Sequence, residues 1–65
     1  MCLSAVYERK DGVERLVLND VCSLSAEEDK ITVTDIIGEK ATVYGAVKSV
    51  DLMRNVIYIE AAVSQ

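Results

Sequence analysis

The dipeptide Asp11-Gly12 constrains the fold of this chain more than any other feature. It lies between two segments in which apolar and polar residues alternate, and this combination is typical of a two-residue type I′ hairpin turn. A turn here pairs Arg9 with Glu14 and Glu8 with Arg15. Both pairs bring opposite charges together, which stabilises the hairpin by a few tenths of a kcal/mol each. The same register also predicts the pairs Lys10–Val13, Tyr7–Leu16 and Ala5–Leu18.

Three later segments have the β-branched, alternating composition of strands. A short polar turn, "DLMRN", separates the last two, and its Asn55 suits the left-handed conformation that a tight hairpin needs. The segment "SLSAEEDK" at 23–30 begins with an N-cap residue followed by acidic side chains, so we expect a loop or a single helical turn there. The predicted strands cover residues 30–37, 40–50 and 56–63.

The composition favours an all-β chain. The 65 residues include no Phe, Trp or Pro, and the apolar residues are mainly Val, Ile, Leu, Ala and three tyrosines. No linker or repeat divides the chain, so we expect one domain over residues 1–65. We predict a small antiparallel barrel of about five strands, SH3-like or Sm-like, or a strongly curved sheet, because closure removes exposed strand edges. A core this small gains little net stability, which favours a homodimer.

The hairpin register assigns one face of the first two strands to the core and the other to a subunit interface. The predicted core face carries Leu3, Ala5, Tyr7, Leu16 and Leu18. The opposite face is too apolar for a plain solvent face, because it carries Cys2, Val6, Val17 and Val21. We therefore expect the second face to contact another subunit, with the Cys2 end near the partner.

The charge of the chain argues against two classes of partner. Seven basic and eleven acidic residues give a net charge of −4, which repels nucleic-acid phosphates and anionic membrane surfaces. The sequence shows no basic, apolar leader and no apolar run long enough to span a bilayer, so we expect a cytoplasmic protein with reduced cysteines. The alternative is an interaction or RNA-binding module, which would use a basic patch of Lys40, Lys48 and Arg54.

The sequence carries no recognisable catalytic motif, and we expect no enzyme activity. The chain has no histidine, so neither a Ser-His-Asp nor a Cys-His arrangement can form. The neighbouring carboxylates of Glu27, Glu28 and Asp29 are interpreted as a solvated loop, because nothing in their sequence context would raise a carboxyl pKa. Gly45, inside "VYGAV", predicts a bulge or sharp bend in a strand.

Cys2 is the residue with the clearest potential for chemistry. A thiolate beside the chain terminus can bind a metal together with a backbone nitrogen or the terminal amine, in fused five-membered rings. Such planar donor sets suit Ni(II) or Cu(II). Two N-termini that meet at a twofold axis would offer two sulfurs and two nitrogens to one metal ion. The residue pattern alone leaves open whether Cys2 is a ligand or a residue without a special role.

Cys22 is interpreted as a small buried side chain. The hairpin register places Cys2 opposite Val21, so Cys22 points to the other face of the sheet. A Cys2–Cys22 disulfide is therefore not expected, and a reducing compartment disfavours it further.

The opening "MCLSAVY", followed by a charged hairpin and a short all-β chain, resembles the CooT family of small nickel-binding proteins. The resemblance implies a homodimer of small β-barrel subunits that holds Ni(II) at the interface. It implies Cys2 as the source of a thiolate and a backbone nitrogen, with Met1 as the source of a terminal amine. It also implies a nickel chaperone or buffer for carbon monoxide dehydrogenase maturation, with that enzyme or other nickel accessory proteins as partners.

Overall fold

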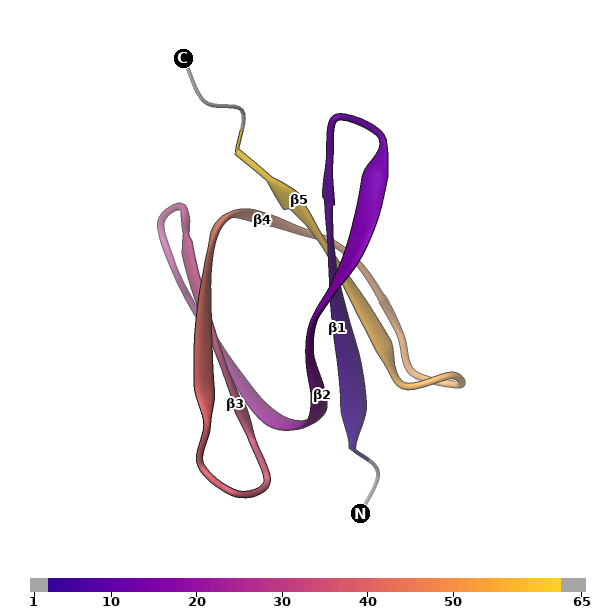
Figure 1. Ribbon diagram of the computed structural model, residues 1–65, viewed down its shortest axis with the longest axis vertical. Coiled ribbons are helices and arrows are strands. Elements are labelled where there is room, and N and C mark those ends of the chain that lie inside the picture. Colours follow the sequence, from indigo (N-terminus) through magenta and orange to yellow (C-terminus); the bar gives the residue numbers. More distant parts are fainter. Residues whose placement is uncertain (1–2, 63–65) are drawn as a thin grey trace.

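Within residues 3–62, which the computed structural model describes, five strands form a closed β-barrel and no helix occurs (Figure 1). Each strand pairs with the next along the chain, and the last pairs with the first. The described residues therefore include no helix that could cross a membrane. The strands are β1 (Ser4–Lys10), β2 (Val13–Glu27), β3 (Lys30–Asp35), β4 (Lys40–Asp51) and β5 (Val56–Ala61).

The predicted all-β, five-stranded barrel is confirmed, except that one pair of neighbouring strands is parallel rather than antiparallel. Four neighbouring pairs are antiparallel, but β1 and β5 are parallel. In a closed ring with an odd number of strands, the strand directions cannot alternate all the way round, so one neighbouring pair must be parallel. β1 and β5 are that pair.

The first hairpin forms at the predicted turn. Asp11 and Gly12 both have positive φ (54° and 78°), as a type I′ turn requires. The four predicted pairs nearest the turn are present, including the ion pairs Arg9–Glu14 at 2.9 Å and Arg15–Glu8 at 3.4 Å. The hydrogen bond that Arg9 donates to Glu14 raises the pKa of Arg9 above its usual value, and the electrostatic attraction of the same carboxylate raises it further.

Further from the turn the register differs from the prediction. Leu18 pairs with Val6 rather than Ala5, and Val21 pairs with Ser4 rather than Cys2. Two register shifts, one on each side of Val6, cause the difference. In such β-bulges one strand contributes an extra residue, and the side chains beyond it change faces.

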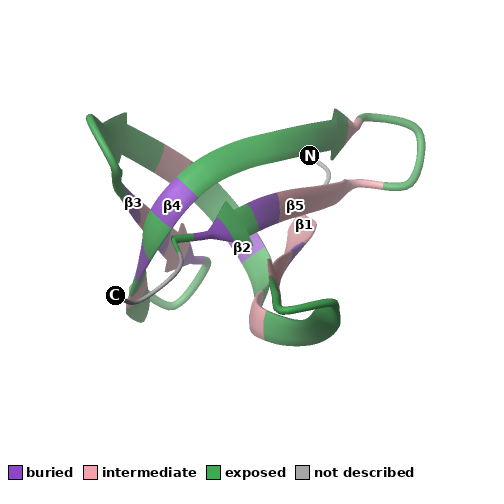
Figure 2. Cartoon of the chain, turned by 90° about the horizontal axis from the view of Figure 1, so that it is seen from above, coloured by how far each residue is buried: buried purple, intermediate pink, exposed green. Residues whose placement is uncertain are grey.

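The predicted assignment of faces is wrong as well, because both faces of the first hairpin carry apolar residues and the sequence pattern favoured the outer one. Val6 and Val21, predicted at a subunit interface, lie in the core and are 0% and 4% exposed. Leu16, predicted in the core, is 53% exposed. Leu3, Ala5, Tyr7 and Leu18 are half-buried, as is Val17. Figure 2 shows the buried segments on the strands around the middle of the barrel, and the core consists of Val6, Val21, Ile31, Val33, Val43, Ile59 and Ala61.

The predicted loop or helical turn at 23–30 is also wrong. β2 continues as a strand to Glu27, which pairs with Lys30, and the chain reverses at Glu28 (φ 51°). The strand persists because Leu24 packs against the core while its backbone completes the ladder with β3. At the other end of β3 the strand stops at Asp35, two residues earlier than predicted.

The second hairpin, between β4 and β5, forms as predicted. Asn55 has a φ of 57° and so provides the left-handed turn residue. Gly45 is buried where β4 changes partners: Tyr44 still pairs with Lys30 of β3, whereas Gly45 pairs with Ala61 of β5. β4 curves over the barrel through this region, as Figure 2 shows.

Candidate functional site

The start of β1 lies at one end of the barrel, between two turns (Figure 1). On one side, the Ala5 N–H donates a hydrogen bond to the carbonyl oxygen of Asn55 in the β4–β5 turn (2.9 Å). On the other side, Ser4 pairs with β2, and the β3–β4 turn is bonded to β2 through Ile36 N–H and the Asp20 carbonyl (3.0 Å). We call this part the N-terminal end, and it comprises Ser4, Asp20, Val21 and the segments 35–39 and 51–55.

The two predicted metal-binding residues, Met1 and Cys2, lie outside the described residues. Both precede Leu3, which is half-buried and directly adjoins β1. Because each residue extends a chain by at most about 3.6 Å, the N-terminal end decides where their donor atoms can reach. The arrangement of this end is therefore the part of the site that the structure provides.

A small cavity of about 160 Å³ opens beside the start of β1. Cys22 lines it, as does Ser4, and the Cys22 thiol donates a long hydrogen bond to the carbonyl oxygen of Asp35 (3.5 Å). Cys22 is a free, exposed thiol, so its predicted burial is wrong. The physical reason is a register shift between Val21 and Ser23, which turns the intervening side chain outward.

One copy of residues 3–62 does not contain a complete metal site. No group of three or more His, Cys, Asp or Glu side chains in this range is arranged to hold a metal ion. Histidine is absent from the whole sequence. A soft metal bound at this end would therefore take its donors from the N-terminal residues, from a second copy, or from both.

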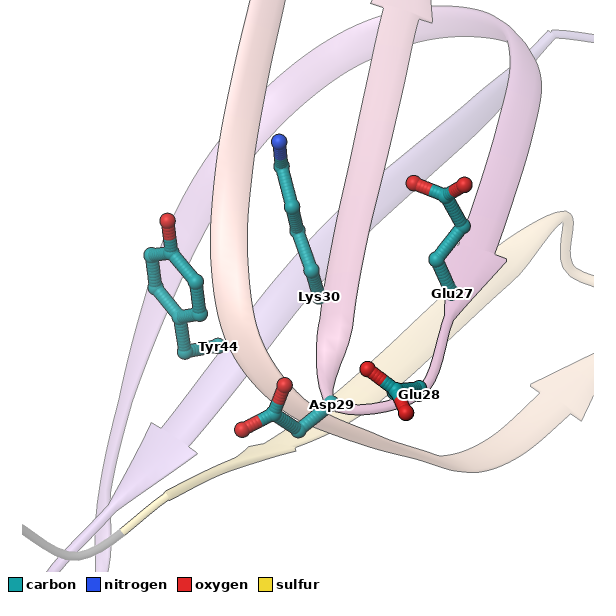
Figure 3. A pocket seen from close by; sticks show the side chains of 5 residues that line it. All are labelled: Glu27, Glu28, Asp29, Lys30 and Tyr44. Atoms are coloured by element: carbon teal, nitrogen blue, oxygen red, sulfur yellow. The ribbon is translucent and has the colours of Figure 1, made fainter.

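The acidic segment between β2 and β3 offers no acid–base pair. Glu27, Glu28 and Asp29 line a broad surface hollow together with Lys30 and Tyr44 (Figure 3). The carboxylates are spread around the turn rather than directed at one point. All three acidic residues are exposed, as predicted for solvated side chains, although Glu27 ends β2 and only Glu28 and Asp29 lie in the turn.

Of the three basic residues of the RNA-binding alternative, Lys48 is paired with an acidic side chain. Lys48 forms an ion pair with Glu60 on the neighbouring strand (3.4 Å). Lys40 directly follows the exposed Glu39 in the sequence. Tyr58 is half-buried, and its ring stacks on Tyr7 with centroids 5.8 Å apart. These features favour packing over the binding of bases or phosphates.

Comparisons with known proteins identify the family of this chain. The protein MJ1551 of Methanocaldococcus jannaschii, described as uncharacterized, is 38% identical over 45 residues, which cover 69% of this chain and 79% of that protein. A crystal structure provisionally assigned to CooT from Carboxydothermus hydrogenoformans has the same fold, with a TM-score of 0.83 at 21% identity over 95% of this chain and 100% of the other. The model of the family described as CO dehydrogenase accessory protein CooT matches residues 1–60, and the chain therefore belongs to the CooT family.

Proposed function

We propose that this CooT protein binds Ni(II) as a homodimer and passes it to the carbon monoxide dehydrogenase system. The observation that carries the proposal is the Met1-Cys2 pair at the start of the family match, directly before a barrel strand. Nickel is the cargo of this protein rather than a catalytic cofactor. The protein acts as a cytoplasmic chaperone or buffer and has no enzyme activity of its own.

Cys2 supplies the thiolate in this proposal. Its own backbone nitrogen, or the terminal amine of Met1, supplies the second donor from the same chain. Ni(II) prefers planar sets of nitrogen and sulfur donors, and two chains related by a twofold axis complete such a set. The absence of histidine from the sequence and of a three-residue donor group from residues 3–62 supports a site shared between subunits.

A site built on a chain terminus suits a protein that gives up its metal. Donors at the surface of a barrel leave room for the donors of an acceptor protein, so the metal can be exchanged without unfolding. A metal enclosed by core residues would need the barrel to open first. The acceptor in this proposal is carbon monoxide dehydrogenase or another nickel accessory protein of the same system.

The test is a titration of reduced, metal-free protein with Ni(II), followed by thiolate-to-nickel charge-transfer absorption. We expect saturation at one Ni(II) per two chains and loss of the band in Cys2→Ser. Cys22→Ser is the matched control, because it removes the other thiol while leaving the proposed ligands intact. A band that persists in Cys2→Ser, or one that disappears in Cys22→Ser, would contradict the assignment of the site.

Delivery needs a separate measurement. Nickel-loaded protein is mixed with nickel-free carbon monoxide dehydrogenase, and the recovery of enzyme activity is followed over time. We expect faster recovery with wild-type protein than with the same amount of Cys2→Ser protein and nickel. Equal recovery of activity in the two samples would contradict delivery and leave nickel buffering as the role of the protein.

A further inference from the structure

Within residues 3–62, the contact between β1 and β5 is the one strand pair that no turn connects. The other four pairs each join consecutive strands, whereas β1 and β5 are the first and last strands of the ring. We call their contact the seam. It is parallel, and parallel pairs are slightly less stable per residue than antiparallel ones. Forming it also closes the longest loop in the barrel, which costs the most entropy.

Two aromatic side chains link the strands of the seam. Tyr7 lies opposite Tyr58, and their rings stack with centroids 5.8 Å apart and planes inclined by 26°. Both side chains are half-buried. Their sequence neighbours Val6 and Ile59 are fully buried in the core, so the alternation of a strand places the two rings on the outer face. Stacked aromatic pairs stabilise a contact beyond the area they bury.

A row of alternating charges crosses the same seam. Arg9 forms an ion pair with Glu14 of β2 (2.9 Å) and lies opposite Glu60 of β5, which in turn pairs with Lys48 of β4 (3.4 Å). Glu14 has the largest effect in raising the pKa of Arg9, and the negative charge of Glu60 raises that pKa further. Arg9 is therefore attracted both within the first hairpin and across the seam.

The first hairpin ends at a bend in β2. This strand pairs with β1 as far as Val21 and with β3 from Val21 onward, and Figure 1 shows it passing from one pairing to the other. Just before this change of partner, Asp20 has a left-handed φ of 53°, and its N–H donates a hydrogen bond to Asn19 Oδ1 (3.0 Å). A register shift follows between Val21 and Ser23. Irregular positions of this kind absorb backbone rotation, as hinges do.

We propose that the first hairpin, residues 4–19, is a flap that opens at the seam and turns about the bend at Asp20 while the rest of the barrel stays folded. The Tyr7–Tyr58 stack and the attraction between Arg9 and Glu60 hold the flap closed.

Opening of the flap changes the N-terminal end of the barrel. It breaks the hydrogen bond from the Ala5 N–H to the Asn55 carbonyl oxygen (2.9 Å), so the start of β1 separates from the β4–β5 turn. The Arg9–Glu14 pair lies inside the flap and stays intact. Because salt screens exposed charges, a higher ionic strength favours the open state. The flap is thus a salt-sensitive device that positions the start of β1.

Amide hydrogen exchange of the whole, reduced, metal-free chain, followed by NMR, tests the proposal without reference to nickel. The reporters of the seam are the Ala5 amide and the amides of β5 that bond to β1, and the amides of β3 report on the remaining barrel. When closing is faster than exchange, each rate reports the free energy of the opening that exposes the amide. We expect the seam amides to exchange about tenfold faster than those of β3, or more.

Two carboxylate variants form a matched pair, because both carboxylates attract Arg9. Glu60→Gln removes the charge across the seam and should raise the exchange rate of the seam amides about two- to fivefold. Glu14→Gln removes the charge inside the flap, a contact that opening does not break, and should leave that rate unchanged. Added salt should accelerate seam exchange in the wild type more than in Glu60→Gln.

The aromatic stack provides a larger effect. Tyr58→Ala should raise the rate of seam exchange about tenfold. Tyr58→Phe retains the ring and should keep the wild-type rate.

Two results would overturn the proposal. If the amides of the seam and of β3 exchange at one common rate in the wild type, the barrel opens only as a whole. If Glu60→Gln and Glu14→Gln change seam exchange equally, the charge across the seam does not hold a flap closed.

Discussion

Gly45 in β4 lies directly against the backbone of Glu60 in β5. A Cβ atom on Gly45 would overlap the carbonyl oxygen of Glu60 and stand 2.9 Å from the Cα of Ala61. The two strands approach this closely only because position 45 has no side chain. The contact occurs where β4 leaves β3 and begins to pair with β5, so the closure of the barrel depends on it.

We expect Gly45→Ala to destabilise the fold strongly. The added methyl group must push β4 and β5 apart, and overpacking of this kind costs about 1–3 kcal/mol in the free energy of unfolding. Gly38→Ala is the matched control, because Gly38 has open space around it and only a left-handed φ of 92°. That backbone strain costs about 1 kcal/mol. Urea unfolding of both variants measures the difference, and equal losses would contradict the close approach.

Asp35→Ala should cost more stability than Asp51→Ala. Asp35 is only 7% exposed and its carboxylate accepts two part-buried backbone hydrogen bonds, so its removal leaves two N–H groups without this acceptor and a gap at a buried position. Such a loss costs about 1–3 kcal/mol. Asp51 accepts two equivalent bonds in an exposed turn, where water can replace the carboxylate.

Asp35→Asn separates the hydrogen bonds from the charge. Asparagine keeps an oxygen acceptor at the same position, so we expect it to retain most of the stability that alanine loses. Urea unfolding of the three variants and of the wild type gives the order of their free energies of unfolding. An Asp35→Ala chain as stable as the Asp51→Ala chain would show that the Asp35 carboxylate is not needed for stability.

The parts of the fold that local chemistry decides could be predicted from the sequence. Asp11-Gly12 and Asn55 adopt left-handed conformations that few other residues tolerate, and both hairpins form where these residues occur. The bulges around Val6 could not be predicted, because they result from packing between strands distant in sequence. These bulges move Leu18 onto the face of Val6. The choice of core face also failed, because Val6 and Leu16 lie on opposite faces and both faces are apolar in sequence.

The candidate site, too, could be predicted only in part from the sequence. The Met1-Cys2 start is visible in the sequence and resembles a family to which the chain proves to belong. The β3–β4 turn at Ile36 and Ile37 was missed, because "TDII" has the pattern of the end of an alternating strand. A usable signal was present: an aspartate precedes two apolar residues both in "DII" and in "DLM". In both places the aspartate captures backbone N–H groups and turns the chain away from the ladder.

Cys22 should react readily with thiol reagents in the folded protein. Its side chain is exposed and lines an open cavity beside Ser4. In the Cys2→Ser variant, where Cys22 is the one remaining cysteine, we expect maleimide labelling in native buffer to approach the rate in urea. Labelling that occurs only after unfolding would contradict the outward orientation that the bulge gives this residue. The control is the double variant without cysteines, which should not be labelled.

Nickel affinity should fall as the pH is lowered. The ligand form of Cys2 is the thiolate, and a free thiol has an ordinary pKa of about 8.5, so binding near neutral pH releases its proton. Lowering the pH by one unit should therefore weaken binding about tenfold for each proton released. Titrations with Ni(II) in a series of buffers measure the slope, and Cys22→Ser should give the same slope as wild type. An affinity independent of pH would exclude thiolate binding, because only donors that carry no proton in the free protein bind a metal without competition from acid.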